Sequence, residues 1–381
     1  MMQKNLTFPL MMLYLVPWGI QCIIGNFMPV YVASLPFATE KTVGEVVALG
    51  AVITMISQVV WTKFADKSKN KNNVLVLSLI LLAAFSGLFL IEGITKPILF
   101  IFVILFYSCY MTHQPLIETI AYENYSATKH SFAWFRSFAS FGYAFIGLLI
   151  TVLPKDNPKN FFIYSGILAI LAVGITKMVP SKNIETIKTV TEKKGIYNKA
   201  YILFLVLTFM FYFCSSITAT FFPVYYTAKD GIGGSVGIYS LMVSVSTFLE
   251  WGIMIVFSKA LEKMKAKHKF FIMGISGIFR SGIIFLVENQ YLILLSFLFQ
   301  EIWYGLLWSS VTPYIKKIVP ENCLASAQGA WTVVSAGLAT FAGTYAGGII
   351  ADVIGLKMLF MIISVVLIFA TGLSIVLVKK E

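Results

Sequence analysis

The stretch PSKNIETIKTVTEKKGIYNK, residues 180–199, is polar and charged in a chain that is otherwise strongly apolar. Of the 381 residues, 58% are hydrophobic and 12% are charged, whereas soluble domains carry about 25% charged residues. Apolar runs recur on both sides of this stretch, and a helix of about 20 apolar residues is long enough to cross the hydrocarbon core of a membrane. The composition therefore predicts a polytopic helical membrane protein.

Twelve apolar segments can be assigned as membrane-spanning helices, six on each side of the polar stretch. Their expected ranges are 8–34, 43–64, 74–94, 97–120, 132–153, 159–179, 199–226, 235–258, 270–288, 290–314, 325–350 and 355–378. Transporters with two related halves have this arrangement. We therefore expect an all-α integral membrane fold, with one six-helix bundle at 1–180, a cytoplasmic linker at 181–198 and a second six-helix bundle at 199–381.

Lysine placement gives the orientation of these helices. If the N-terminus is cytoplasmic, the lysine-rich loops at 63–71 and 259–269, the linker and the C-terminal tail all lie on the inner side. Cytoplasmic loops carry an excess of Lys and Arg, so we expect both termini to be cytoplasmic and the protein to lie in the cell membrane. Orientation and attraction to anionic lipid also explain the net charge of +12 without a nucleic-acid partner.

Arginine is used differently from lysine in this chain. Among 29 basic residues only Arg136 and Arg280 are arginine, and both lie in apolar segments. Glu118, Glu250 and Glu301 are acidic residues in or near the expected spans. An unpaired charge at such a depth costs at least about 2.5 kcal/mol, so these residues normally face a bundle interior or an aqueous cavity. A charged residue near a helix end can instead extend its side chain to the membrane interface, where the charge is in water.

The spacing of four of these charges pairs them across two helical hairpins. The midpoint of Glu118 and Arg136 is residue 127, inside the polar turn SATKHS, and the midpoint of Glu250 and Arg280 is residue 265, inside KALEKMKAKHK. Residues equidistant from a hairpin turn lie at the same depth in antiparallel helices. A guanidinium stays charged and binds a carboxylate or two hydroxyls bidentately. Each half is therefore expected to present a carboxylate and a guanidinium at one level.

Several segments carry a resemblance that covers nearly the whole chain. RSFASFGYA (136–144), LEWGIMIVFSKAL (249–261), FRSGI (279–283) and the glycine-rich stretch at 327–355 are similar to helices five, eight, nine and eleven of the major facilitator superfamily. WTKFADKSKNKNN (61–73) resembles the superfamily's loop motif after helix two, with Asp66 and Lys67 at matching positions. More narrowly, the chain resembles the group of proton-coupled permeases that includes lactose permease and 3-phenylpropionate permease.

The resemblance implies a secondary active transporter that moves a small polar solute by alternating access, most simply by proton symport, with a sugar or oligosaccharide favoured. It implies a substrate site with Glu118, Arg136 and Tyr143 in one half and Glu250 in the other. Arg280 would belong with Glu250 to the proton-coupling set, and Asp66 with Lys67 to a gating motif. Asn26, on the first span, is a further candidate for the substrate site, although an interhelical hydrogen bond would explain it equally well.

The expected tenth helix departs from the resemblance. LFQEIWYGLLW (298–308) places Gln300 where family members usually carry histidine, and Trp303 where lactose permease has a glutamate. Glutamine forms hydrogen bonds but does not titrate. We therefore expect Gln300 to contribute to substrate binding. Glu301 then becomes a candidate to carry the proton together with Glu250, within reach of Arg280.

Other functional classes gain little support. The motifs GxxxxGK[ST], HExxH and GxSxG are absent, and the four cysteines lack metal-ligand spacing. We expect a monomeric transporter that is not an enzyme, uses no cofactor or metal, and acts on a small molecule and protons. Uptake of an organic acid, especially an aromatic one, and efflux of a drug or metabolite by proton antiport stay open as alternatives. A channel would have no need of two Glu–Arg pairs.

Overall fold

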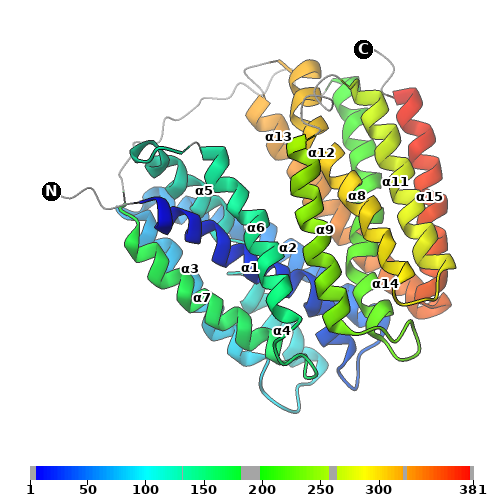
Figure 1. The fold of residues 1–381 in the computed structure, drawn as a ribbon, viewed down its shortest axis with the longest axis horizontal. Coiled ribbons are helices and arrows are strands. Elements are labelled where there is room, and N and C mark those ends of the chain that lie inside the picture. Colours follow the sequence, from blue (N-terminus) through cyan, green and yellow to red (C-terminus); the bar gives the residue numbers. More distant parts are fainter. Residues whose placement is uncertain (1–5, 131, 182–197, 257–263, 321–323, 378–381) are drawn as a thin grey trace. The chain divides into compact units, whose positions relative to one another are not determined.

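The computed structural model describes residues 6–130, 132–181, 198–256, 264–320 and 324–377, and throughout these ranges the regular structure is helical (Figure 1). The first seven helices are α1 (Thr7–Ala33), α2 (Glu40–Lys67), α3 (Lys71–Leu88), α4 (Lys96–Tyr107), α5 (His113–Asn124), α6 (Phe132–Ile150) and α7 (Asn160–Met178). The later ones are α8 (Lys199–Thr227), α9 (Val236–Val256), α11 (Ala266–Leu286), α12 (Ser296–Ile318), α13 (Leu324–Thr332), α14 (Thr340–Ile354) and α15 (Leu356–Leu377).

Among the described residues, nine helices are long and apolar enough to cross a membrane, and α4 and most of α6 are shorter apolar helices. The all-helical membrane class is confirmed, while the number of twelve spans stays a prediction. The expected single helix at 97–120 is wrong. The chain there forms α4 and α5, separated by a turn in which Met111 has a φ of 61°. Pro115 lies in the first turn of α5; it has no N–H to donate to the carbonyl of residue 111 and its ring clashes with that carbonyl, so an unbroken helix through this point is unfavourable.

The chain divides into two compact units. Unit 1 consists of Met1–Ala38, Leu49–Ile187 and Val236–Thr247, and unit 2 of Thr39–Ala48, Lys188–Ser235 and Phe248–Glu381. The start of α2 therefore belongs to unit 2 and the start of α9 to unit 1. The expected boundaries at 1–180, 181–198 and 199–381 stay a prediction, because residues 182–197 lie outside the described part of the chain.

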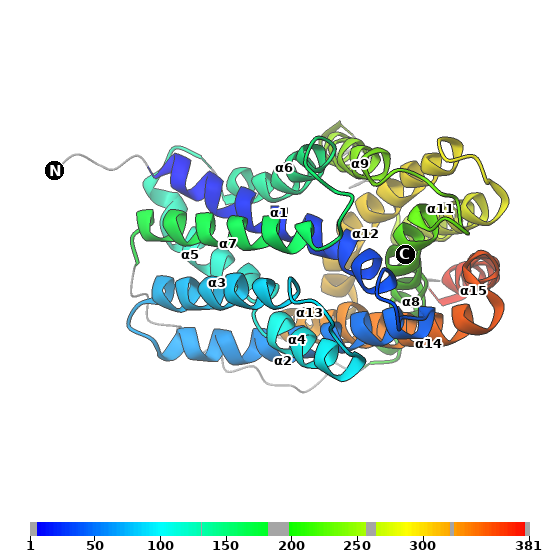
Figure 2. The ribbon, with the colours of Figure 1, turned by 90° about the horizontal axis from the view of Figure 1, so that it is seen from below.

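Helix α1 forms the centre of unit 1. It packs against α6 and α7, and α3 packs against α7, as Figure 2 shows. A Cβ atom on Gly142 of α6 would overlap the backbone of Leu15, so only glycine permits this approach of α6 to α1. Phe27 of α1 stacks on Phe161 of α7, with ring centroids 4.3 Å apart. This packing fixes the face of α1 that meets α6.

At one end of α3, α5 and α7 in unit 1, side chains of α3 and α5 form an ion pair and donate hydrogen bonds to backbone carbonyl groups that follow α7. Lys71 Nζ lies 2.6 Å from Glu123 Oε1, and the two side chains are only 13% and 5% exposed. Asn72 Nδ2 donates to the carbonyl oxygen of Val179 at 2.6 Å, and Asn124 Nδ2 donates to that of Pro180 at 3.1 Å. These bonds satisfy carbonyl groups that a helix end would otherwise leave without a partner.

In unit 2, α11 packs against α12 and α15, and α8 packs against α14 and α15. Ser281 of α11 and Ser364 of α15 are hydrogen-bonded at 2.8 Å. Asn198 caps α8, because its side chain accepts from the backbone N–H of Tyr201 at 2.9 Å. Between α13 and α14 the helix continues through a π-helical segment, Val333–Ala339, which packs against α8.

Candidate functional site

The centre of the candidate site in unit 1 is an ion pair between α5 and α6. Arg136 Nε lies 2.6 Å from Glu118 Oε1, and 42% of the arginine side chain and 29% of the glutamate side chain are exposed. The structure therefore brings together the two residues that the hairpin spacing placed at one depth. Both stay accessible to a ligand, since neither side chain is enclosed.

Two aromatic residues of α1 hold this ion pair in place. Tyr14 Oη donates to Glu118 Oε2 at 2.9 Å. The Arg136 guanidinium lies over the Trp18 ring, 5.2 Å from its centroid, an arrangement that favours a cation electrostatically. The Tyr14 and Trp18 rings are themselves 5.4 Å apart. The sequence analysis did not identify either residue, although their spacing of four places them on one face of a helix.

Asn26 and Tyr143 form a second polar cluster in unit 1. Asn26 is 9% exposed, and its Nδ2 donates to Tyr143 Oη and to the carbonyl oxygen of Cys22, both at 2.8 Å. Tyr239, in the part of α9 that belongs to unit 1, approaches Asn26 Oδ1 with its hydroxyl at 3.5 Å. Asn26 thus makes the interhelical hydrogen bond that was the alternative to a ligand contact. Tyr143 is half-buried, with its hydroxyl engaged.

His113 extends the aromatic group in unit 1. It is the first residue of α5 and contacts Trp18 edge to face, with ring centroids 6.1 Å apart. The residue is 1% exposed, and its Nδ1 has no hydrogen-bond partner among the described residues. The His113 ring therefore packs against Trp18, and the Trp18 ring in turn lies against the Arg136 guanidinium.

The candidate proton-coupling residues gather in unit 2. Arg280 of α11 is 7% exposed and Glu301 of α12 is 2% exposed. The carboxyl groups of Glu250 and Glu301 lie within hydrogen-bonding reach of each other. Such a bond requires a donor, and an ionised carboxylate can only accept. A hydrogen bond between the two carboxyl groups would therefore need one of them to be protonated.

Tyr304 connects these charged residues. Arg280, Glu301 and Glu250 lie close enough to Tyr304 to act on it electrostatically, and its hydroxyl lies near that of Ser215 on α8. Tyr304 follows Glu301 by three residues on α12, so the two side chains leave the helix on neighbouring positions of one face. The sequence analysis passed over Tyr304 because it lies between two tryptophans in an apolar run.

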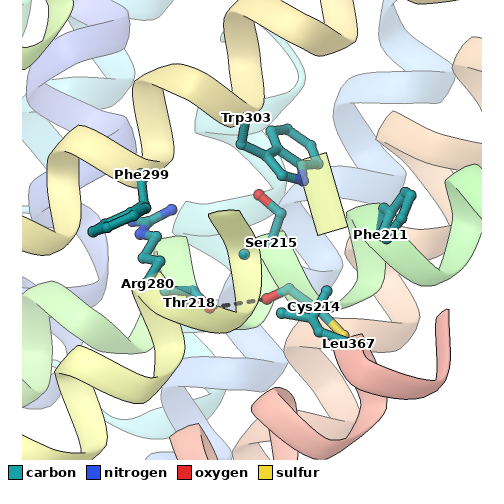
Figure 3. A pocket seen from close by; sticks show the side chains of 9 residues that line it. Phe211, Cys214, Ser215, Thr218, Arg280, Phe299, Trp303 and Leu367 are labelled. Atoms are coloured by element: carbon teal, nitrogen blue, oxygen red, sulfur yellow. Dashed lines mark hydrogen bonds between the residues drawn. The ribbon is translucent and has the colours of Figure 1, made fainter. Parts of the chain in front are cut away.

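A pocket within unit 2 borders Arg280. Figure 3 shows Arg280, Ser215 and Trp303 around it, with Phe211 of α8 and Leu367 of α15 among its apolar walls. Trp303 contacts Tyr212 edge to face at 5.5 Å and Tyr304 at 4.9 Å. Trp303 therefore forms a wall of this pocket.

Gln300 is half-buried, and its side chain leaves α12 about 100° around the helix from that of Glu301. It makes no hydrogen bond to the described residues. Lys67, one half of the expected gating motif, is the exposed last residue of α2. The side chain of Asp66, the other half, lies outside the described part of the structure. Within the described ranges, no group of three metal-ligating side chains is present.

Comparisons with known proteins agree with this architecture. The model of the "MFS_1 like family" matches residues 8–362. An uncharacterized transporter of Bacillus subtilis strain 168, YwbF, is 21% identical over 369 residues, which cover 94% of this chain and 90% of that protein.

Two solved structures illustrate the similarity in fold. A mutant of the nucleoside transporter NupG superimposes with a TM-score of 0.88 at 16% identity, covering 99% of this chain and all of the other. A mutant of a peptide transporter of the POT family, in complex with sulfate, has a TM-score of 0.77 at 13% identity, with 97% and 93% covered. Because the family model covers nearly all of the chain, this protein is a multi-pass membrane transporter that belongs to the MFS_1 like family, and not an enzyme.

Proposed function

We propose that this transporter imports a small hydroxyl-rich solute, with a sugar or oligosaccharide favoured, by proton symport and alternating access. It would act as a monomer in the cytoplasmic membrane with both termini inside. Asp66 and Lys67 would form part of the gate. Glu118 and Arg136 would contact the solute, and Tyr143, Asn26, Glu250 and Gln300 are further candidates for substrate contact.

The observation that carries the proposal is the geometry of the Glu118–Arg136 pair. The glutamate meets the arginine through Nε, whereas most of the N–H donors of a guanidinium are on its two terminal amino groups. With 42% of the Arg136 side chain exposed, these donors are available to hydroxyl oxygens of a solute. The carboxylate beside them can accept from hydroxyl groups of the same solute.

The same pair favours a neutral solute over an organic acid. Glu118 and Arg136 together carry no net charge, so this half of the site does not call for an anion. A carboxylate solute at Arg136 would lie beside the Glu118 carboxylate, and like charges at that distance repel. An organic acid would therefore bind only if Glu118 moved away or took up a proton.

Proton coupling is supported by the closeness of Glu250 and Glu301. A bond between these carboxyl groups would hold a proton, and its loss would place two negative charges side by side, which is unfavourable in a buried site. Arg280 lies close by and would balance the single negative charge that the pair carries when it shares one proton. A site of this kind can load and release one proton per transport cycle.

A nucleoside is a second candidate substrate. The solved structure with a TM-score of 0.88 is that of a nucleoside transporter, and the ribose of a nucleoside offers adjacent hydroxyl groups to the same carboxylate and guanidinium. The base would then need a partner elsewhere in the site. A sugar is favoured here because the Glu118–Arg136 pair accounts for it without a further subsite.

The experiment is transport into proteoliposomes that contain the purified chain. Sugars, nucleosides and aromatic acids are first screened by the thermal shift they produce, and each stabilising compound is then tested for accumulation under an imposed inward proton gradient. We expect a sugar to accumulate and a protonophore to abolish its accumulation. Stabilisation by aromatic acids alone would overturn the substrate class.

The same vesicles distinguish the direction of solute transport and test its coupling to the proton gradient. Export of the solute driven by an inward proton gradient would show antiport, and uptake that the protonophore leaves unchanged would rule out proton coupling. The matched pair of variants is Glu118→Gln, which removes a charge at the proposed site, and Glu288→Gln, which removes an exposed charge that pairs with Lys357. Only the first is expected to weaken transport.

A further inference from the structure

Helices α5 and α6 bring together a pair of aromatic rings as well as the Glu118–Arg136 ion pair. Tyr122 follows Glu118 by four residues on α5, and Phe132 precedes Arg136 by four residues on α6. Residues four apart lie on one face of a helix. The Tyr122 and Phe132 rings contact each other edge to face, with centroids 5.6 Å apart. The two helices therefore present an ion pair and, one turn closer to the loop that joins them, an aromatic pair.

Tyr125 fixes the position of this aromatic pair. Its ring centroid lies 5.6 Å from that of Tyr122 and 5.9 Å from that of Phe132. Tyr125 and Phe132 both pack against the hydrophobic core of unit 1, whereas Tyr122 is 63% exposed. Two rings of this cluster are thus anchored in the core, and the third offers an open ring surface.

The face of α5 that carries Tyr122 also carries charge, and this indicates that it meets water and not lipid. The side chains of Glu118 and Arg136 are 29% and 42% exposed. Charged groups within a membrane protein face the bundle interior or an aqueous cavity, because a charge against hydrocarbon is costly. Thr119, the neighbour of Glu118, is exposed as well. A solute that reaches the ion pair through water therefore also has access to the Tyr122 ring.

The spacing of the two pairs matches a solute that has two rings. A helix rises 1.5 Å per residue, so four residues separate the ion pair from the aromatic pair by about 6 Å along the helix. A second ring joined to the first by a glycosidic bond spans this distance. Its apolar face can lie on the Tyr122 ring while hydroxyl groups of the first ring bind Glu118 and Arg136. Aromatic side chains combine a large apolar surface with a preferred stacking geometry, which suits a flat partner.

We propose that Tyr122 and Phe132 form a subsite for a second ring of the solute, beside the Glu118–Arg136 pair. The transported solute is then a hydroxyl-rich ring that carries another ring, as in a disaccharide or a nucleoside, and not a free monosaccharide. The inference rests on the proposed function and narrows its substrate class.

The three aromatic residues have different roles in this subsite. Tyr122 contacts the second ring of the solute, because it is the exposed member of the cluster. Phe132 and Tyr125 are positioning residues, since their rings contact that of Tyr122 from the core side. A ring that is already held in place loses little conformational freedom when the solute binds, and this preorganisation favours affinity.

The test compares compounds that share a first ring and differ in the second. Glucose is paired with maltose, galactose with melibiose, and ribose with uridine, and the affinity of the purified full-length protein for each is measured by calorimetric titration. We expect the two-ring member of one pair to bind roughly three- to tenfold more tightly than its single-ring partner, the contribution typical of a stacked ring. The disaccharide pairs and the uridine pair distinguish a sugar from a nucleobase as the second ring.

Variants of Tyr122 connect this difference to the aromatic pair. Tyr122→Leu keeps an apolar side chain but removes the ring, so affinity for the two-ring compound should fall to that of the single ring, and affinity for the single ring should not change. Tyr122→Phe keeps the ring and should bind both compounds as the wild type does. Arg136→Lys, by contrast, should weaken both members of the pair, because both use the ion pair.

Tyr291→Leu is the matched control. Tyr291 is 60% exposed and precedes the short 3-10 helix Leu292–Leu295 in unit 2, so its replacement should leave every affinity unchanged. If Tyr122→Leu does not fold, Phe132→Leu decides, since loss of the ring that orients Tyr122 should weaken the two-ring compound alone.

Wild-type affinity of Tyr122→Leu for the two-ring compound would overturn the subsite and leave the proposed function intact. Tyr122 would then serve only as an aromatic anchor at the membrane interface. An equal loss for both members of the pair would overturn the subsite as well, because it would show a general effect on the ion pair. If none of the six compounds binds to the wild-type protein, the proposed substrate class is refuted, and the subsite with it.

Discussion

Arg136 meets Glu118 at 2.6 Å through Nε, and thus along one edge of its guanidinium. Trp18 lies beneath the face of the same group, 5.2 Å from its carbon atom. The contact of Glu118 with the guanidinium edge, the contact of Trp18 with its face and the position of Arg136 on α6 together define the direction in which the remaining N–H groups point. An ammonium group has no edge and no face, so lysine at this position would keep the charge and lose the direction.

Arg136→Lys is therefore expected to keep the protein folded and inserted but to weaken substrate binding. Loss of a charge-assisted hydrogen bond costs about 1.5–3 kcal/mol, which corresponds to roughly ten- to hundredfold in affinity. The measurement is binding of the identified solute at matched expression. Lys129→Arg, in the neighbouring loop, is the control and should be silent. Near-wild-type affinity of Arg136→Lys would remove this residue from the site.

Tyr14→Phe is expected to affect both stability and affinity. The variant keeps the ring beside Trp18 but removes the hydroxyl that donates to Glu118 Oε2, at an expected cost of about 1 kcal/mol in unfolding free energy. Glu118 loses an orienting bond, so solute affinity should fall several-fold.

The matched control for Tyr14→Phe is Tyr31→Phe. The Tyr31 hydroxyl donates to the carbonyl oxygen of Phe89 at 3.3 Å, elsewhere in unit 1. This variant should lose stability without loss of affinity. If both variants bind the solute as tightly as the wild type, Tyr14 has only a structural role.

Glu301→Gln and Glu250→Gln are each expected to abolish accumulation of solute against a gradient. Glutamine retains hydrogen bonding but cannot release a proton, so the coupled half of the cycle stops. Exchange of labelled for unlabelled solute, which requires no net proton movement, should continue. Accumulation by Glu301→Gln at the wild-type level would show that the carboxyl pair does not carry the transported proton.

Glu123→Ala is expected to destabilise unit 1 strongly, by about 3–5 kcal/mol, because it leaves the largely buried Lys71 ammonium without its carboxylate. Replacement of both partners together, with Lys71→Met and Glu123→Leu, should restore much of the loss. Thermal unfolding in detergent measures both. The comparison is Glu288→Ala, which removes the exposed partner of Lys357 and should leave the unfolding midpoint unchanged. A mild effect of Glu123→Ala would mean that Lys71 finds another partner or reaches water.

Gly142→Ala is expected to disrupt the contact of α6 with α1, because the added Cβ would overlap the Leu15 backbone. Since α6 carries Arg136, solute binding should fall together with stability. Gly174→Ala on α7 is the control. Its Cβ would meet nothing within 4 Å, and alanine favours a helix interior over glycine by roughly 1 kcal/mol. An equal response of the two variants would contradict the close approach at Gly142.

The sequence predicted most of the fold because its strongest signal is composition. Apolar runs long enough to span a membrane correspond to helices in nearly all the expected ranges. The break between α4 and α5 was missed, because a turn around Met111 inside an apolar run has no polar signature. The units also share α2 and α9, which hydropathy cannot reveal, since it describes one helix at a time.

The charged residues of the candidate site could be predicted from the sequence. Glu118 and Arg136 are conspicuous in an apolar chain, and the arithmetic of their hairpin placed them together. Tyr14, Trp18 and Tyr304 were not recognised, because aromatic residues in a membrane helix are common and only their contacts set them apart. Gln300 and Glu301 are neighbours in sequence, and it is the rotation of α12 that puts Glu301 against Glu250.

The π-helical segment Val333–Ala339 has a consequence for the length of the chain itself. A π turn holds one residue more than an α turn over the same rise, so one residue of this segment is surplus to the helix that contains it. Removal of a single residue there would restore α geometry and let α14 keep its place against α8. Deletion of Gly337 should therefore yield folded protein, whereas deletion of the buried Ser276 from the middle of the regular helix α11 should rotate the later side chains of that helix by about 100° and abolish folding. Equal yields of the two deletions would show that the segment holds no spare residue.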